Sequence, residues 1–216
     1  MNIDFIILAA GKGTRMGGDS PKVLASLAGK PMIQHLIDTV DSFPNSKTSI
    51  VVGYKSNEVE RNLVSQKKLR FVKQKNQLGT AHAVKQALPN IRKNSVAVIL
   101  YGDVPLVKKN TLNRLIKSAS TGKLSLLTFI KEDPTGYGRI IRGSRKNVQK
   151  ITEHKDASSA EKEIREVNSG ILAIKANLLQ QFISKIKNNN AAKEYYLTDL
   201  VEISNNHSVD VVATLC

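Results

Sequence analysis

Residues 3–13 read IDFIILAAGKG, an apolar run that only Asp4 interrupts and that ends in two glycines. A continuous run rich in Ile and Leu is typical of a strand buried on both faces, as in a parallel sheet. We therefore expect residues 3–9 to form the first strand, in a central position. Glycines directly after such a strand let backbone N–H groups approach a phosphate closely, and Lys12 and Arg15 add positive charge. The stretch thus indicates a nucleotide site.

The glycine spacing narrows the kind of site. Gly11 and Gly13 begin like a dinucleotide fingerprint, but the next position of that pattern is Met16. A P-loop is excluded because no Gly-Lys-Ser/Thr sequence follows. A flexible surface turn stays open as the alternative, since a short glycine pattern is not specific by itself.

Strand and helix patterns alternate beyond this stretch, which favours an α/β fold. Helical spacing or caps predict helices at about 31–40, 56–65, 81–88, 112–119, 176–186 and 198–203, with Ser56 and Thr80 as expected N-caps. Apolar runs predict strands at 3–9, 49–54, 69–72, 95–101 and 124–130. After about residue 138 the predicted strands are shorter, at 139–142, 148–152, 166–174 and 209–213. This second half indicates a mixed or antiparallel addition to a parallel sheet.

Composition excludes several classes of protein. The 216 residues are 41% hydrophobic, which is enough for one folded core and too much for a disordered chain. No apolar run near the start approaches the length of about 20 residues that a membrane span needs. The single cysteine, Cys216, fits a reducing compartment, so we expect a cytoplasmic protein without a membrane partner. The net charge of +15 attracts anions of any kind and does not choose among them.

A longer string is more specific than the glycines alone. Residues 8–16 read LAAGKGTRM and residues 21–24 read PKVL. Together they resemble the signature of sugar-1-phosphate nucleotidyltransferases, which join a nucleoside triphosphate to a sugar phosphate and release pyrophosphate. The resemblance implies a Rossmann-like, GT-A-like α/β fold with a mostly parallel central sheet, helices on both faces and a smaller mixed addition.

Six further strings extend this resemblance over essentially the whole chain: QLGTAHA at 77–83, YGDVPL at 101–106, DPTGYGR at 133–139, EHKDA at 153–157, NSGI at 168–171 and EYYLTD at 194–199. In this order they are similar to the uridyltransferase domain of the bifunctional uridyltransferase/acetyltransferase that makes UDP-N-acetylglucosamine. The implied substrates are UTP and N-acetylglucosamine 1-phosphate, and the implied role is to supply cell-wall precursors.

The resemblance also assigns catalytic roles. Arg15 would neutralise the triphosphate, and Lys22 would lie near its bridging phosphates. Asp103 follows an apolar strand at the carboxyl end, where open α/β sheets bind ligands, and would hold Mg²⁺, the expected cofactor. A helix cap or a turn is the other interpretation of Asp103. We find no Ser-His-Asp or Cys-His nucleophile arrangement and expect no covalent intermediate.

The binding residues follow from the same resemblance. The expected nucleotide-binding residues are Leu8, Ala9, Ala10, Gly11, Gly13, Lys22, Gln74, Gly79 and Thr80. The expected sugar-binding residues are Tyr101, Gly102, Asp103, Gly138, Glu153, Asn168, Tyr195 and Thr198. His82 is interpreted as structural, since a lone helical histidine is more often packed or solvated than catalytic.

Two features of the family are missing from these residues. The family's second metal ligand is an asparagine in a Val-Asn-Asn segment beyond the last strand, and the sequence stops at Cys216 before one. Hexapeptide repeats are absent, so we expect no C-terminal left-handed β-helix domain and no acetyl-CoA activity. We expect one domain over 1–216, with a nucleotide-binding half at about 1–110 and a sugar-binding half at about 111–216.

Three alternatives stay open. The chain could use another base or sugar phosphate, or bind a UDP-sugar without turnover because the metal site is incomplete. The charge of +15 could instead serve nucleic-acid binding, although 5% aromatic residues and no Trp argue against a base-stacking surface. We expect no specific nucleic-acid partner, and the sequence leaves open whether the chain forms a homo-oligomer.

Overall fold

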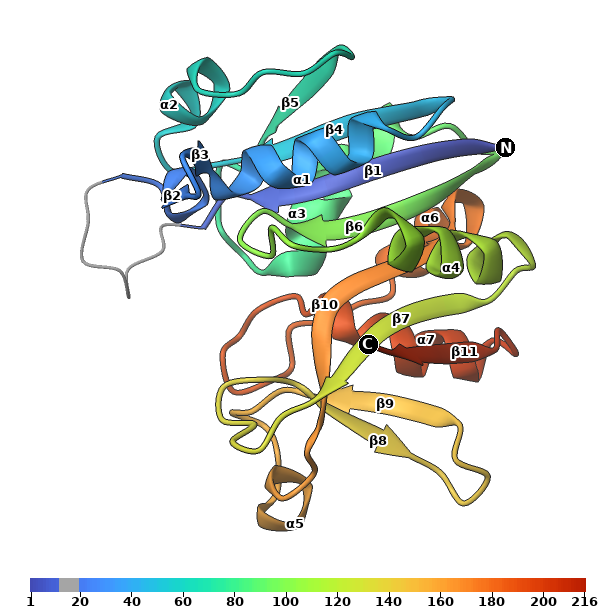
Figure 1. Cartoon of the computed structure of the whole chain (residues 1–216). Coiled ribbons are helices and arrows are strands. Elements are labelled where there is room, and N and C mark those ends of the chain that lie inside the picture. Colours follow the sequence, from blue (N-terminus) through green and yellow to red (C-terminus); the bar gives the residue numbers. More distant parts are fainter. Residues whose placement is uncertain (12–19) are drawn as a thin grey trace.

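A computed structural model describes residues 1–11 and 20–216 of the chain (Figure 1). Its described part contains a nine-stranded sheet and a two-stranded one. The large sheet comprises β1 (Asn2–Ala9), β4 (Ser46–Val52), β5 (Leu69–Lys73), β6 (Ser95–Tyr101), β7 (Leu124–Ile130), β8 (Arg139–Arg142), β9 (Val148–Thr152), β10 (Glu166–Lys175) and β11 (Val211–Leu215). The small one pairs β2 (Ser26–Leu27) with β3 (Lys30–Pro31).

The first strand lies inside the parallel part of the large sheet. The strand order is β11-β7-β10-β6-β1-β4-β5, and β1 pairs in parallel with both β4 and β6. Side chains alternate between two cores, because Ile6 and Leu8 join one apolar cluster while Phe5 and Ile7 join the other. The central, doubly buried strand expected from the sequence is confirmed.

Helices cover both faces of this sheet, as the sequence predicts. The described helices are α1 (Met32–Asp41), α2 (Ser56–Arg61), α3 (Thr80–Ala87), α4 (Lys109–Ser120), α5 (Ser159–Lys162), α6 (Ala176–Ile183) and α7 (Leu200–Asn206), with 3-10 turns η2 (Lys22–Leu24), η3 (Leu88–Asn90) and η4 (Leu197–Asp199); all of the helices but α5 pack on the sheet. Helices α1, α2 and α4 contribute to one apolar cluster, and α3, α6 and α7 to the other. Figure 1 shows α1 and α4 on the near side of the sheet.

The second half adds mixed strands, as expected. Strand β10 runs antiparallel to β6 and β7, while β11 runs parallel to β7 at the sheet edge. The hairpin of β8 and β9 joins β10 through a single pairing, Val167 with Arg139. Figure 1 shows this hairpin and α5 at the end of the molecule away from β4 and β5.

The expected N-caps are wrong for two helices. Lys55, with a φ of 47°, precedes α2, and Ser56 is already helical. Gly79 precedes α3, and the hydroxyl of Thr80 accepts a hydrogen bond from the backbone N–H of Leu197 at 2.9 Å. A distant segment therefore uses the oxygen that local sequence assigned to capping. The sequence also missed α5, which the reciprocal cap of Ser158 and Glu161 stabilises.

Within residues 1–11 and 20–216, no helix combines the length and apolar character that crossing a membrane requires.

The strand order indicates where a ligand can bind. After β1 the chain builds β4 and β5 on one side and then returns to β6 on the other. The carboxyl ends of β1 and β6 thus flank a reversal of strand order, which is where open α/β sheets form ligand crevices.

Candidate nucleotide and sugar-phosphate site

A pocket of about 520 Å³ opens at the carboxyl ends of β1 and β6. It is lined by Leu8, Ala9, Ala10, Gly11, Lys22, Val23, Gln74, Gln77, Gly79, Thr80, Ala83, Tyr101, Asp103 and Glu194. Every expected nucleotide-binding residue that the structure describes is in this set. Gly13 and Arg15 lie outside the described residues.

The end of β1 forms one wall, and its backbone is held by residues distant in the sequence. The Gln77 amide donates to the carbonyl of Ala10 at 2.6 Å, and the N–H of Gly102 donates to the carbonyl of Leu8 at 2.9 Å. A Cβ added to Gly53 would lie 2.8 Å from the Ala10 carbonyl oxygen. Sequence reasoning missed Gln77, although it opens the QLGTAHA string.

Gln74 is held in one orientation at the pocket wall. The residue is 4% exposed, and its Nε2 donates to the Gly79 carbonyl at 3.1 Å and lies 3.0 Å from Nδ1 of His82. In this orientation of the Gln74 amide the Nδ1 atom of His82 accepts, because an amide nitrogen only donates. Among the described residues Oε1 of Gln74 has no partner, so it can accept from a base N–H. The structural role expected for His82 fits this contact.

Gly79 is required by close backbone packing. Its φ is +112°, and an added Cβ would lie 2.6 Å from the carbonyl oxygen of Tyr195 and 2.7 Å from its nitrogen. Tyr195 donates to the Leu78 carbonyl at 2.8 Å and accepts from the N–H of Ala81 at 2.9 Å. These bonds bring the 194–195 segment onto the start of α3, so the pocket combines residues from both halves of the chain.

Lys22 and Asp103 meet at the pocket. Lys22 lies in η2, Asp103 follows β6, and their Nζ and Oδ2 atoms are 2.7 Å apart. Both side chains are about one-third exposed, at 37% and 32%. The pair places one cation and one carboxylate beside the glycine end of β1, where phosphate charge would need balancing.

The donor set suits Mg²⁺ in part. Asp103 offers hard carboxylate oxygens, and Mg²⁺ is commonly held by one or two carboxylates together with substrate phosphates and water. Within the described residues no group of three or more His, Cys, Asp or Glu side chains could hold a metal ion. Asp103 and Glu194 are the carboxylates that line this pocket, and Asp103 lies beside Lys22.

Four of the expected sugar-binding residues, Gly138, Glu153, Asn168 and Thr198, form a second group beside the pocket. The Thr198 hydroxyl donates to Oε1 of Glu153 at 3.0 Å, and the N–H of Asn168 donates to the Gly138 carbonyl at 2.9 Å. Burial raises the pKa of Glu153, and repulsion by Asp156 and Glu194 adds to this, although the Thr198 bond opposes it.

Tyr101 connects the two groups. It lines the large pocket and, with Asn168 and Thr198, a small cavity of about 10 Å³. A Cβ on Gly170 would lie 2.7 Å from its ring, so the ring packs against bare backbone. Burial raises the pKa of Tyr101 well above its usual range, and its hydroxyl stays neutral. The side chain of Tyr195 instead lines a different pocket, on the other side of α3.

Comparison with known proteins agrees with this architecture. A model of the MobA-like NTP transferase domain matches residues 5–167. The chain belongs to this family. The matched part contains most of β1, the Lys22–Asp103 pair and the start of α3. The nucleotide pocket described above therefore lies almost entirely within the NTP transferase domain.

Several curated proteins are similar to this chain in sequence over most of its length. The chain is 46% identical over 202 residues to the bifunctional protein GlmU of Cellvibrio japonicus (strain Ueda107), covering 94% of this chain and 44% of that protein. It is 48% identical over 200 residues to the bifunctional protein GlmU of Ruthia magnifica subsp. Calyptogena magnifica, and the match covers 93% of this chain and 44% of that protein. The chain thus spans less than half the length of these relatives.

Solved structures share the fold at low identity. A UDP-glucose pyrophosphorylase complexed with UDP-glucose matches with a TM-score of 0.79 and 17% identity, over 99% of this chain and 91% of that one. A putative glucose-1-phosphate thymidylyltransferase from Bacillus anthracis matches with a TM-score of 0.78 and 17% identity, over 99% of this chain and 87% of that one. The NTP transferase fold expected from the sequence is confirmed.

Proposed function

We propose that this NTP transferase domain transfers a uridylyl group from UTP to N-acetylglucosamine 1-phosphate, giving UDP-N-acetylglucosamine and pyrophosphate for cell-wall precursor synthesis. The observation that carries the proposal is the pocket at the ends of β1 and β6, in which Gly11, Gln74 and Gly79 surround a space beside the Lys22–Asp103 pair. The similarity to bifunctional GlmU proteins over more than 90% of this chain supports the choice of substrates.

The reaction needs positioning and charge balance more than side-chain nucleophiles. An oxygen of the sugar phosphate attacks the α-phosphorus of UTP, forming a new P–O bond, while the bond between the α-phosphorus and its bridging oxygen breaks and pyrophosphate leaves with the electron pair. Both phosphates must be held in line, so the cationic groups around them lower the barrier. Lys22 is one such cation, and Arg15, outside the described residues, is assigned as another from the sequence resemblance.

The remaining residues divide into a base site and a sugar site. Leu8, Ala9 and Ala10 would pack against the uracil, while the free oxygen of Gln74 would accept from its N–H. Gly79 and Thr80 complete the base site, and Gly13 is assigned to the phosphate loop from sequence. The proposed sugar contacts are Tyr101, Gly102, Gly138, Glu153, Asn168 and Thr198.

Asp103 would hold Mg²⁺, which supplies charge neutralisation on the phosphate oxygens when it is bound. Lys22 is 2.7 Å from one oxygen of this carboxylate. In the substrate complex we expect Lys22 to turn to phosphate, which frees that oxygen.

A cytoplasmic location fits the exposed free thiol of Cys216, since reducing compartments keep thiols unpaired.

A turnover assay tests the proposal. Pyrophosphate release is measured for UTP, CTP, GTP and ATP, each with N-acetylglucosamine 1-phosphate and with glucose 1-phosphate, in Mg²⁺ and in EDTA. We expect turnover in Mg²⁺ with UTP and N-acetylglucosamine 1-phosphate and none in EDTA. Preference for another nucleotide would overturn the base assignment. Calorimetric binding of UDP-N-acetylglucosamine without any turnover would leave a binding domain and overturn the catalytic role.

A further inference from the structure

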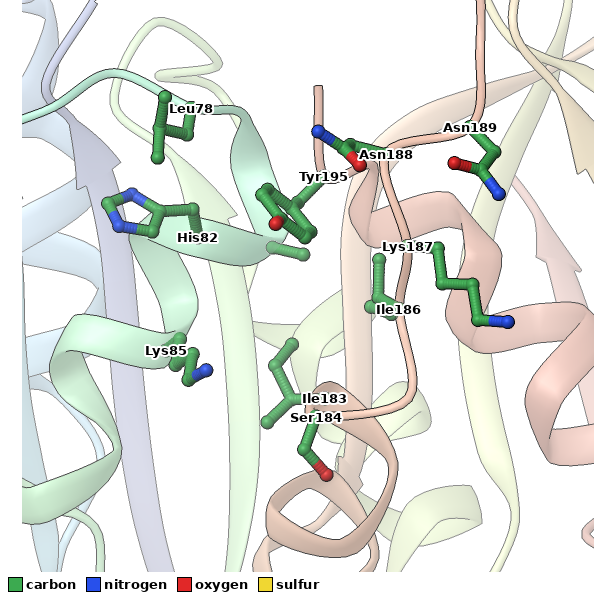
Figure 2. Close-up of a pocket in the computed structure, with 11 residues that line it drawn as sticks. Leu78, His82, Lys85, Ile183, Ser184, Ile186, Lys187, Asn188, Asn189 and Tyr195 are labelled. Atoms are coloured by element: carbon green, nitrogen blue, oxygen red, sulfur yellow. The ribbon is translucent and has the colours of Figure 1, made fainter. Parts of the chain in front are cut away.

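A second pocket, of about 510 Å³, lies on the opposite side of α3 from the nucleotide pocket. Figure 2 shows His82 and Lys85 on one side of it, and Ile186, Lys187 and Asn188 of the segment after α6 on the other. Tyr195 and Leu78 close one end, and Ile183 and Ser184 the other. The proposed reaction uses no side chain of this pocket.

Apolar and polar side chains contribute about equally to its walls. Ile183 and Ile186 are buried, at 4% and 5% exposure, and Ala81 lies beside them. Leu78 is 44% exposed at the rim, which leaves a large apolar side chain in solvent. Water over such a wall is displaced favourably by an apolar group of about the right shape.

The residues that line this pocket include two lysines, two asparagines, His82, Ser184 and Tyr195, and no carboxylate. Lys85 and Lys187 both line it, and neither has an ion-pair partner among residues 1–11 and 20–216. Within that part of the chain the side chains of Asn188 and Asn189 and the hydroxyl of Tyr195 are also without hydrogen-bond partners. Figure 2 shows Lys85 at this pocket, whereas the side chains of Lys187 and Asn189 extend away from it on the far side of the segment after α6. The Lys85 ammonium, with the Asn188 amide across the pocket, attracts an anion, and the apolar part of the wall selects an organic one.

Only the first turn of α3 and the residues just before it separate the two pockets. Residues alternate between them: Gly79 and Thr80 face the nucleotide pocket, whereas Leu78, Ala81 and His82 face the second one. The hydrogen bond between Gln74 and His82, 3.0 Å long, crosses this wall. A ligand against His82 would therefore act on the glutamine that we assign to the base.

We propose that the second pocket binds a small organic anion with an aromatic or similar apolar body, and that its occupancy changes nucleotide affinity through the Gln74–His82 contact. The binding part is independent of the proposed transferase reaction, and the coupling part rests on it. Because coupling between two binding sites is reciprocal, the anion and UTP must change each other's affinity by the same factor.

The binding part is tested with naphthalene-1-sulfonate, an aromatic anion that lacks phosphate, by following backbone amide signals of the whole labelled chain. We expect saturable shifts at residues 78–85 and 183–189. Methanesulfonate tests the charge alone and 1-naphthalenemethanol the apolar body alone, and both should bind at least about fivefold more weakly. Absence of shifts in these segments at 20 mM probe, on the order of a weak ligand's dissociation constant, would overturn the proposal.

Charge variants supply the matched control. The double variant Lys85→Gln/Lys187→Gln should weaken the binding of naphthalene-1-sulfonate at least about fivefold, since the ion pair with Lys85 and the nearby charge of Lys187 are lost. Lys93→Gln/Lys117→Gln removes two other exposed lysines outside both pockets and should leave the affinity unchanged. Equal losses in both double variants would show a general effect of net charge and overturn the site.

Calorimetry with UTP then tests the coupling. A saturating change in UTP affinity of about threefold or more, lost in Lys85→Gln/Lys187→Gln, is the expected result. Unchanged UTP affinity at saturating probe would overturn the coupling. If UTP does not bind even without the probe, the proposed transferase function fails, while the amide map still decides whether the second pocket binds its anion.

Discussion

At the scale of single residues, the contact between Lys22 and Asp103 joins two of the proposed catalytic groups. The two residues are 81 positions apart and meet at 2.7 Å beside the glycine end of β1. Sequence resemblance assigned each a role next to phosphate, and the fold brings both to one pocket. Their catalytic roles stay predictions, which a substitution can separate from simple binding.

Asp103→Asn should lower kcat about 100-fold or more and change UTP affinity by less than about threefold, because a carboxylate that holds metal acts mainly on the charge developing in the transition state. Steady-state turnover and calorimetry measure the two effects. Asp38→Asn is the matched control, since Asp38 forms a comparable pair with Lys30 at 2.8 Å, away from the pocket, and should leave kcat unchanged. Equal losses of kcat and affinity in Asp103→Asn would contradict the assigned role.

Gly79→Ala should destabilise the fold by about 2 kcal/mol or more, because a positive φ and a backbone clash with Tyr195 add together. Gly136→Ala isolates the first cause: its φ is +83° and nothing lies within 4 Å of the added Cβ, so it should cost about 1 kcal/mol. Urea unfolding measures both variants. If both variants lower the free energy of unfolding by the same amount, the backbone of Tyr195 does not clash with a side chain at position 79, and the close packing is contradicted.

At the scale of elements, the turn η4 connects the sugar residues to α7. Thr198 bonds Glu153 of the loop after β9, and Asp199 lies next to it within reach of several carboxylates. Burial, together with repulsion from Glu202, Glu153 and Asp156, raises the pKa of Asp199 from 3.8 to about 6. The folded state therefore holds a proton at Asp199 that the unfolded state releases. This contribution to stability is fully present below about pH 4 and is lost as the pH rises through about 6.

Asp199→Asn should accordingly stabilise the protein at pH 7.5, by about 1 kcal/mol after allowance for the partial exposure of the carboxyl, and change little at pH 4. Urea unfolding at the two pH values measures the difference. Asp133→Asn is the control, because hydrogen bonds from Thr135 lower the pKa of Asp133 and no gain is expected at pH 7.5. A gain of equal size at both pH values for Asp199→Asn would point to packing rather than charge.

Element boundaries show where local patterns were sufficient. The strand at 95–101 and the ten-residue helix after Pro31 match β6 and α1, because each has its own apolar period and clear end signals. The strand expected at 49–54 starts three residues earlier, at Ser46, and ends at Val52. Thr48 and Ser49 are polar but buried, so tertiary packing extends β4 beyond its apolar sequence.

At the scale of the whole molecule, the charge of +15 creates a positive field that draws in phosphorylated ligands. Among the residues that the structure describes, some cations form ion pairs, such as Arg142 with Glu166 at 2.7 Å. Others, such as Lys85, have no ion-pair partner there. A field of this kind attracts any polyanion at low salt. Attraction alone is therefore no sign of a nucleic-acid site.

Binding to a 20-base-pair DNA duplex, a length of roughly two helical turns, should be weak at low salt and vanish by about 0.15 M salt, because only screened charges contribute. Fluorescence anisotropy at rising salt measures this. UTP binding should survive the same change, since pocket contacts add to the field. Nanomolar duplex binding that persists at 0.15 M salt would instead support the nucleic-acid alternative.

The sequence by itself determined the parallel strands, their order along the chain and the glycine-rich end of β1, because side-chain periodicity and turn residues act between near neighbours. Only the tertiary structure decided which distant groups meet: Thr80 with Leu197, Gln74 with His82, and Tyr195 on the far side of α3 rather than beside the sugar residues. Buried polar atoms take whichever partner the packed chain brings within bonding distance, and no local pattern records that choice.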